Sequence, residues 1–182
     1  VFLPGVADIR FIAQALVDST AGDLLLCPLF GDLTLKQQQQ AIEPTENGIH
    51  KIVLATNIAE TSLTIEGINL VIDCGLEKVA IYDAQTLTNQ LQLRNISKAS
   101  AVQRMGRAGR VMAGKCLRLY NSEDFHRRNE QSISEIQQAD LLPMVIELAR
   151  WGVKKLADLP MIELPAKVQE SQAWSELQQL QL

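Results

Sequence analysis

The chain alternates between short apolar runs and longer segments in which apolar residues recur every three or four positions. The short runs are rich in β-branched residues and have the length of buried strands. We expect strands at residues 2–3, 24–29, 51–55, 69–74 and 116–120. Because helix-length segments separate most of these runs, the pattern predicts an α/β fold in which helices flank a parallel sheet.

Helix signals stand between the strands. Apolar residues at positions 9, 12, 13 and 16 fall on one face of a helix that ends near Gly22. Thr34 and Gln37 have the spacing of a capping box, which predicts a helix over residues 35–42 that closes before Pro44. Ser97 is in position to cap a further helix that starts at about residue 98.

Residues 77–96 break this alternation. Their apolar side chains recur at every second position on both sides of a polar turn at 83–89, which predicts an inserted β-hairpin. After residue 122 the strand signals cease, and we predict one helix over 141–151, capped by Asp140 and ended by Gly152, and another over 165–180. We therefore expect a domain over 1–132 and a short helical extension over 133–182.

The composition is that of a soluble intracellular chain. With 182 residues and 47% apolar content it can bury one substantial core. It has no apolar run of membrane-spanning length and no signal peptide at its start, so we expect a cytoplasmic location. Cys27, Cys74 and Cys116 are widely spaced within apolar runs, which favours reduced core thiols over disulfides or a metal site. Since Val1 lies inside an apolar run, we expect the chain to be cut from a longer protein.

Positive charge is concentrated in one part of the chain, although the net charge is −4. Between Arg94 and Arg128 nine basic residues stand against two acidic ones, whereas the rest of the chain has 8 basic and 19 acidic residues. A basic segment on an acidic body is typical of a site for a phosphate-bearing partner.

The run QRMGRAGR at 103–110 is the strongest candidate for that site. It predicts a row of Arg104, Arg107 and Arg110 along one side of a helix, with Gly106 and Gly109 permitting close approach of another surface. Guanidinium groups bind phosphate oxygens in pairs and stabilise the charge of a γ-phosphoryl group in transfer. A solvated basic helix or a localisation signal would explain a lone RxxR motif, but neither needs two glycines in a helix interior.

QRMGRAGR resembles the sixth motif of superfamily 2 helicases, in the spelling of the DEAH-box branch. FLPG at 2–5 resembles the fourth motif of that branch and ATNIAETSLTIEG at 55–67 the fifth. The predicted hairpin lies between motifs five and six, as it does in DEAH-box proteins. The resemblance covers most of residues 1–120 and implies a second RecA-like domain. Residues from about 133 resemble the start of the winged-helix region that follows the motor. Two further runs, PLFGDLTLKQQQQAI and ADLLPMVIELARWGV, resemble one bacterial group of ATP-dependent helicases.

The resemblance implies that Gln103, Arg107 and Arg110 face the γ-phosphate of ATP, with the two arginines as fingers. Arg104 would support the nucleotide site or the structure around it. The nucleic-acid backbone would be bound by short polar side chains, which suit contacts to phosphates and sugars. These residues would be Thr56, Asn57 and Thr64.

Three more residues have implied roles on the nucleotide side. Ser62 would sense the state of the nucleotide, and Glu66 would lie near the ribose, at a position where relatives often carry Asp. Ile42 stands where spliceosomal relatives place a phenylalanine that stacks on the adenine. The resemblance thus implies apolar contact between Ile42 and the base in place of π stacking. The alternative is that Ile42 belongs to the core.

A second phosphate motif is incomplete. GRVMAGKC at 109–116 nearly matches the phosphate-binding loop GxxxxGK[ST], but Cys116 replaces the hydroxyl that would bind Mg²⁺, and a strand is predicted after it instead of a helix. His50 and His126 are isolated in the sequence, and we expect both at the surface. The chain also lacks a DEAH-type acidic motif, so ATP with Mg²⁺ would be bound mainly by a first RecA-like domain.

The expected function is the second motor domain of an ATP-dependent RNA helicase, inactive as an isolated fragment. Its partners would be single-stranded nucleic acid, RNA in preference to DNA, and the first RecA-like domain of the same chain. We expect the protein to be a monomer and not to bind a membrane. The hairpin would separate or guide strands, unless it merely extends the sheet. Trp151 and Trp174 are expected in the core. The alternative function is a non-catalytic RNA-binding or regulatory module, and the paired arginines favour the motor over it.

Overall fold

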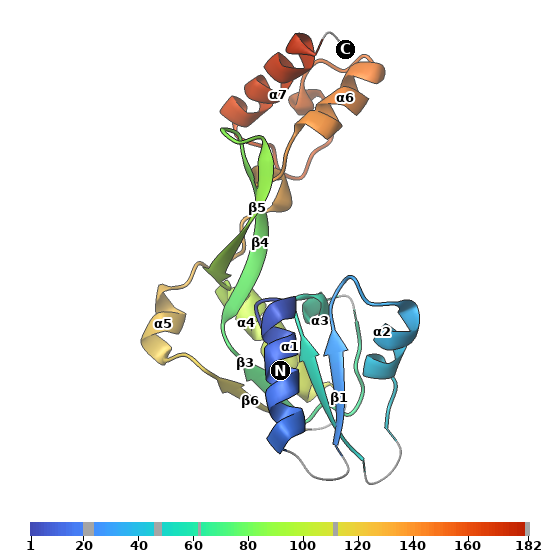
Figure 1. The fold of residues 1–182 in the computed structure, drawn as a ribbon. Coiled ribbons are helices and arrows are strands. Elements are labelled where there is room, and N and C mark those ends of the chain that lie inside the picture. The colour runs from blue at the N-terminus through green and yellow to red at the C-terminus, as the bar shows by residue number, and fades with distance from the viewer. Residues whose placement is uncertain (20–23, 46–48, 62, 111–112, 181–182) are drawn as a thin grey trace. The chain divides into compact units, whose positions relative to one another are not determined.

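The computed structural model describes residues 1–19, 24–45, 49–61, 63–110 and 113–180 (Figure 1). The chain forms two compact units. The first contains Val1–Lys78 and Leu93–Ser132, and the second contains Val79–Gln92 and Ile133–Leu182. The far part of the hairpin therefore groups with the C-terminal segment, while its base groups with the N-terminal unit.

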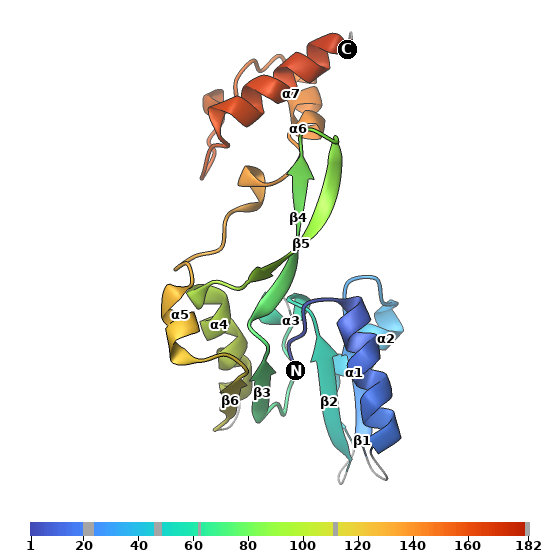
Figure 2. The same cartoon turned by 60° about the vertical axis from the view of Figure 1, so that its left-hand side comes forward.

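Parallel strands form the centre of the first unit (Figure 2). The paired strands are β1 (Leu24–Leu29) with β2 (His50–Ala55), and β3 (Leu70–Asp73) with β6 (Lys115–Arg118). The N-terminal segment lies between the two pairs, because Phe2 forms parallel bridges to both Ala55 and Asp73. The predicted parallel sheet is confirmed, although the strand expected at residues 2–3 is reduced to this bridge.

Helices pack on the strands of this unit. They are α1 (Val6–Ser19), α2 (Leu35–Ile42), α3 (Ile58–Thr61), α4 (Lys98–Met105) and the short 3-10 helix η1 (Gly106–Gly109). The first two contact β1, whereas α4 and η1 contact β3, and α3 contacts α4. The expected α/β fold with flanking helices is thus confirmed. The residue expected to end α1, Gly22, lies outside the described residues.

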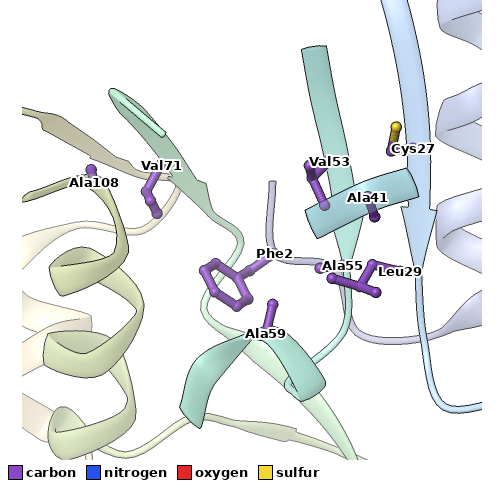
Figure 3. Close-up of a cluster of buried hydrophobic side chains, with 9 residues drawn as sticks. All are labelled: Phe2, Cys27, Leu29, Ala41, Val53, Ala55, Ala59, Val71 and Ala108. Atoms are coloured by element: carbon purple, nitrogen blue, oxygen red, sulfur yellow. The ribbon is translucent and has the colours of Figure 1, made fainter. Parts of the chain in front are cut away.

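The core of the first unit surrounds Phe2 (Figure 3). Val71 and Ala108 lie on one side of its ring and Ala55 and Leu29 on the other, with Ala59 of α3 facing it. Burial of a large apolar side chain stabilises a fold by about 1.5–3 kcal/mol. This cluster therefore fixes the strand ends from which the candidate site residues extend.

Local sequence signals account for the boundaries of several helices. The capping box of α2 is present, since the Gln37 backbone N–H donates to Thr34 Oγ1 (3.4 Å) and the Thr34 N–H to Gln37 Oε1 (3.0 Å). Ser97 caps α4 by accepting from the Ser100 N–H at 3.1 Å. Helix α5 (Ser122–Arg127) was not expected. None of its residues is buried, so its sequence has no apolar periodicity that would predict a helix.

The second unit combines the far part of the hairpin with helices. The hairpin strands are β4 (Leu76–Asp83) and β5 (Thr88–Asn95), and the helices are α6 (Leu142–Arg150), α7 (Lys167–Gln179) and the 3-10 turns η2 (Glu135–Gln137) and η3 (Leu156–Asp158). A small core of Leu141, Val145, Ala173 and Leu177 joins α6 to α7. The inserted hairpin and the helical extension are both as predicted.

The two tryptophans differ in their surroundings. Trp174 packs against the small core of the second unit, as expected. The prediction for Trp151 is wrong: its side chain is 73% exposed, because α6 ends at Arg150 and Gly152, at φ 79°, turns the chain away. Asp140 Oδ1 accepts from the Leu142 N–H at 2.9 Å, while Leu141 itself holds the N-cap position. Within the described ranges, no helix has the length and apolar character needed to cross a membrane.

Candidate nucleotide and nucleic-acid site

The first group of candidate residues follows the carboxyl end of β2. The Thr56 N–H donates to Leu29 O (3.2 Å), which continues the pairing of β2 with β1 by one residue. The carbonyls of Thr56 and Asn57 then accept the first N–H groups of α3, from Ala59 and Glu60. Thr56 is half-buried and Asn57 is exposed. Ligands of open α/β sheets bind at this edge, outside the carboxyl ends of the strands.

The second group lies on α4 and η1, where the three arginines do not form one row. The α-helix ends at Met105 and tightens into η1, which gives successive arginines different directions. Arg104 is fully buried, and its guanidinium binds Glu60 Oε2 (3.0 Å) and Asp73 Oδ1 (2.9 Å). The expectation that the three arginines lie along one side of a helix is therefore wrong for Arg104, which points into the core.

Arg104 stays charged in this position. Burial lowers the pKa of Arg104, but the negative charge of Asp73 and the hydrogen bonds that Arg104 donates to Asp73 and Glu60 outweigh that effect and raise the pKa overall. Removal of one partner from such a buried pair leaves an uncompensated charge. The geometry thus assigns Arg104 a structural part in holding α3, α4 and β3 together.

Arg107 and Arg110 both contact the segment that follows α3. Arg107 donates through Nη1 to Leu63 O (2.6 Å) and through Nη2 to Glu60 O. Arg110, which is exposed, donates through Nη1 to Thr64 Oγ1 (2.6 Å). Burial and the nearby charge of Arg110 lower the pKa of Arg107. Two neighbouring positive charges of this kind favour the approach of an anion.

The remaining predicted residues are placed as follows. Gln103 on α4 and Glu66 are exposed, and Ile42 is the half-buried last residue of α2. Among the described residues, no hydrogen bond joins these three to Arg107 or Arg110. Ser62 lies outside the described residues.

The glycines of QRMGRAGR face open space. A methyl group added at Gly106 or Gly109 would meet no atom of the described chain within 4 Å, so packing within this chain does not require glycine at either position. Gly114 is different, because an added methyl would collide with the backbone of Ala108. Its place in the apparent phosphate loop is thus explained by packing, and strand β6 follows it as predicted. His50 and His126 are exposed, also as predicted.

Sequence reasoning missed the two acids, Glu60 and Asp73, that bind Arg104 and so hold residues 103–110, the arginine segment. Asp73 is fully buried and accepts from three donors, namely Arg104 Nη1, the Tyr120 hydroxyl (2.9 Å) and the Gly75 N–H (2.9 Å). Its signal in the sequence is an aspartate at the end of the apolar run LVID. Because buried carboxylates are almost always paired, that position alone pointed to a cationic partner.

Comparison with known proteins decides the family. Residues 1–112 match the family model described as the helicase conserved C-terminal domain. The chain belongs to this family. It is 46% identical over 167 residues to the ATP-dependent RNA helicase HrpB of Escherichia coli strain K12. The aligned region covers 92% of this chain and 21% of that protein. The chain is 38% identical over 165 residues to the ATP-dependent RNA helicase HrpA homolog of Haemophilus influenzae, covering 91% of this chain and 12% of that protein.

Two crystal structures of E. coli HrpB, one described as a DExH-box NTPase and one as a DEAH/RHA helicase, share this fold. Their TM-scores are 0.89 and 0.92, each at 45% identity over 98% of this chain. The match covers 22% and 23% of the solved chains, so this helicase C-terminal domain spans about a fifth of HrpB. The assignment to the DEAH-box branch and its HrpB-like group is confirmed. The roles of single residues stay predictions.

Proposed function

We propose that this chain is the second motor domain of an ATP-dependent RNA helicase and supplies Arg107 and Arg110 to ATP bound on a first RecA-like domain. The observation that carries this proposal is the pair of arginines held on the segment 60–64. Phosphoryl transfer needs such cationic donors at the transferring group, and the open space at Gly106 and Gly109 leaves room for another surface to approach them.

The contacts of the arginines suit a reversible role. Arg107 binds two carbonyl oxygens and Arg110 a hydroxyl oxygen, all of them neutral acceptors. A phosphate oxygen is a stronger acceptor for a guanidinium, since a charge-assisted hydrogen bond is roughly twice as strong as a neutral one. The two side chains therefore exchange their present partners for the γ-phosphate when the cleft between the motor domains closes. Gln103 contributes a further polar group from the exposed face of α4.

ATP fits this donor set only in part. Arg107 and Arg110 suit its phosphates, Ile42 and Glu66 would contact the base and ribose, and Ser62 would respond to the nucleotide. Among the described residues, no group of three or more His, Cys, Asp or Glu side chains is placed to hold a metal ion. We propose that the first RecA-like domain binds the metal and most of the nucleotide.

The nucleic-acid strand would be held beside this site. Thr56, Asn57 and Thr64 offer hydroxyl and amide groups to its backbone, which fixes the strand without reading its sequence. Thr64 also accepts from Arg110, so one hydrogen bond separates the proposed strand contact from the proposed finger. The hairpin adds exposed apolar side chains, with Leu91 72% and Leu93 58% exposed, that suit a guide or wedge for unpaired bases.

The proposal is tested on the full-length parent protein by its ATPase rate with and without single-stranded RNA. Arg107→Ala is expected to lower RNA-stimulated turnover by about 10³-fold or more while nucleotide binding persists, because an arginine finger acts on the transition state. Arg150→Ala is the matched control, since Arg150 is an exposed arginine that forms an ion pair with Glu147 on the surface of α6. Unchanged turnover in Arg107→Ala, or a parent with no ATPase activity, would favour the non-catalytic RNA-binding module instead.

A further inference from the structure

One arginine outside the helicase motifs is buried at the base of the hairpin. Arg128 is 9% exposed, whereas the side chain of its neighbour Arg127 is 77% exposed. Through Nη1, Arg128 donates to Gly75 O (2.6 Å) and to Ile96 O (3.0 Å). Gly75 directly precedes β4 and Ile96 directly follows β5. A single guanidinium therefore bridges both ends of the hairpin, which the Ile96 N–H also joins by donating to Gly75 O (3.1 Å).

The ring of Tyr120 packs against this guanidinium. The Arg128 guanidinium carbon lies 4.0 Å from the centre of the Tyr120 ring, within the range of a cation–π contact. The Tyr120 hydroxyl donates to Asp73 Oδ2, and burial together with Asp73 raises the pKa of Tyr120, so the hydroxyl keeps its proton. Arg128 and Tyr120 are thus connected to the buried acid that also holds Arg104.

The backbone at this point accepts only glycine. Gly75 has φ +74°, a conformation that side chains disfavour. A methyl group there would lie 2.5 Å from the Tyr120 ring and 2.6 Å from Arg128 Nη2. Gly75 also donates its N–H to Asp73 Oδ1 at 2.9 Å. The close fit of Gly75, Tyr120 and Arg128 shows that the hairpin base is packed around the guanidinium.

A continuous set of contacts joins this base to the proposed finger. Arg104 donates to Leu76 O at the start of β4 (3.2 Å) and to the carboxylates of Asp73 and Glu60. The carbonyl of the same Glu60 accepts from Arg107. Buried polar networks of this kind are rigid, because a broken contact leaves a polar group without solvent. The segment that holds Arg107 and the two strand ends of the hairpin thus belong to one connected set of contacts, which runs through Glu60, Arg104 and Asp73.

Apolar burial does little to fix strand β5, although the Lys78–Asp8 ion pair (3.5 Å) and the buried Ile96 also tie the hairpin base to the first unit. The residues of β5 are exposed except Arg94, which is only partly buried, so burial of apolar surface contributes little along that strand. A two-stranded hairpin alone is marginally stable in water. The polar contacts at the base therefore contribute more to the orientation of the hairpin than they would if one face of the hairpin were buried.

We propose that Arg128 and Tyr120 form a clamp that makes the hairpin move with the arginine segment, and that both are positioning residues for strand separation. This inference rests on the proposed helicase function. The clamp determines how much RNA duplex is separated for each ATP hydrolysed. It does not act on hydrolysis, which depends on Arg107 and Arg110. A purely structural role would lower both activities together through loss of folded protein.

The test uses the full-length parent protein and measures RNA-stimulated ATPase and unwinding of an RNA duplex with a single-stranded overhang on the same samples. Arg128→Gln is expected to keep ATPase within about 2-fold of the parent while unwinding per ATP falls about 10-fold, the scale of energetic coupling between sites. Tyr120→Phe, which keeps the ring and removes the hydroxyl, should give a smaller loss in the same direction. Arg127→Gln is the matched control and should leave both rates unchanged.

Two results would overturn the clamp. An Arg128→Gln protein with the unwinding yield of the parent would show that the hairpin base needs no guanidinium for coupling. Equal losses of ATPase and unwinding would show a structural role only. If Arg128→Gln does not fold, an unchanged yield in Tyr120→Phe contradicts the inference by itself. A parent that lacks RNA-stimulated ATPase contradicts the proposed function, which distinguishes that failure from failure of the clamp.

Discussion

At the scale of single residues, Asp73 is the acid that connects the arginine segment to its surroundings. It lies fully buried and faces Arg104 as well as the Tyr120 hydroxyl and the Gly75 N–H. Asp73→Asn would leave the Arg104 charge without this partner in the core, so we expect the free energy of unfolding to fall by about 3–5 kcal/mol. Equilibrium urea unfolding of the 182-residue chain measures this loss.

The control for this prediction is an acid in an exposed pair. Glu147 contacts Arg150 on the surface of α6, and Glu147→Gln should change the free energy of unfolding by less than about 1 kcal/mol, because solvent screens such pairs. A loss in Asp73→Asn no larger than that of the control would mean that Arg104 is stabilised without Asp73.

The arginines also show what a motif predicts and what it leaves out. QRMGRAGR predicted that Arg104, Arg107 and Arg110 lie along one side of a helix. The structure brings only Arg107 and Arg110 onto one segment, where they contact Glu60, Leu63 and Thr64. The motif did not predict that Arg104 turns inward. That outcome depends on Glu60 and Asp73, which lie 44 and 31 positions away in the sequence and become its neighbours only in the folded sheet.

At the scale of elements, helix α2 is defined by its first turn. Few of its residues are buried, so capping contributes a large part of its stability. Thr34→Ala removes the hydroxyl of the capping box and should lower the free energy of unfolding by about 1 kcal/mol. Lys36→Ala in the same helix is the control, since Lys36 is exposed and alanine is the better helix former. Urea unfolding of the two variants compares them, and equal stabilities would contradict the capping argument.

Elements with a strong local pattern were predictable, and those without one were not. Strand β1 and helix α2 occur at the residues that periodicity and capping indicate, and the hairpin shows its two-residue alternation. Helix α5 buries no side chain, so its sequence contains no apolar stripe to detect. The pattern across 141–151 likewise indicated the helix, but the exposure of Trp151 depends on the turn at Gly152.

At the scale of the whole molecule, the proposed function makes this chain one side of a catalytic site. It spans about a fifth of HrpB, and it offers cationic donors for phosphates but no phosphate-binding loop of its own. If Arg107 and Arg110 act on ATP held by another domain, the isolated chain has nothing on which they can act. We therefore expect the 182-residue chain to release phosphate from ATP at the background rate, with or without RNA.

The decisive comparison places Arg107→Ala in two settings. In the full-length parent the substitution removes a donor from an assembled site, whereas in the isolated chain that site is never complete, so the same substitution should change nothing there. Phosphate release measured for both proteins and both variants separates the two cases. If the isolated chain hydrolysed ATP in a manner that depends on Arg107, the arginine would belong to a nucleotide site contained within this chain. The division of labour between two motor domains would then be wrong, even though the family assignment would stand.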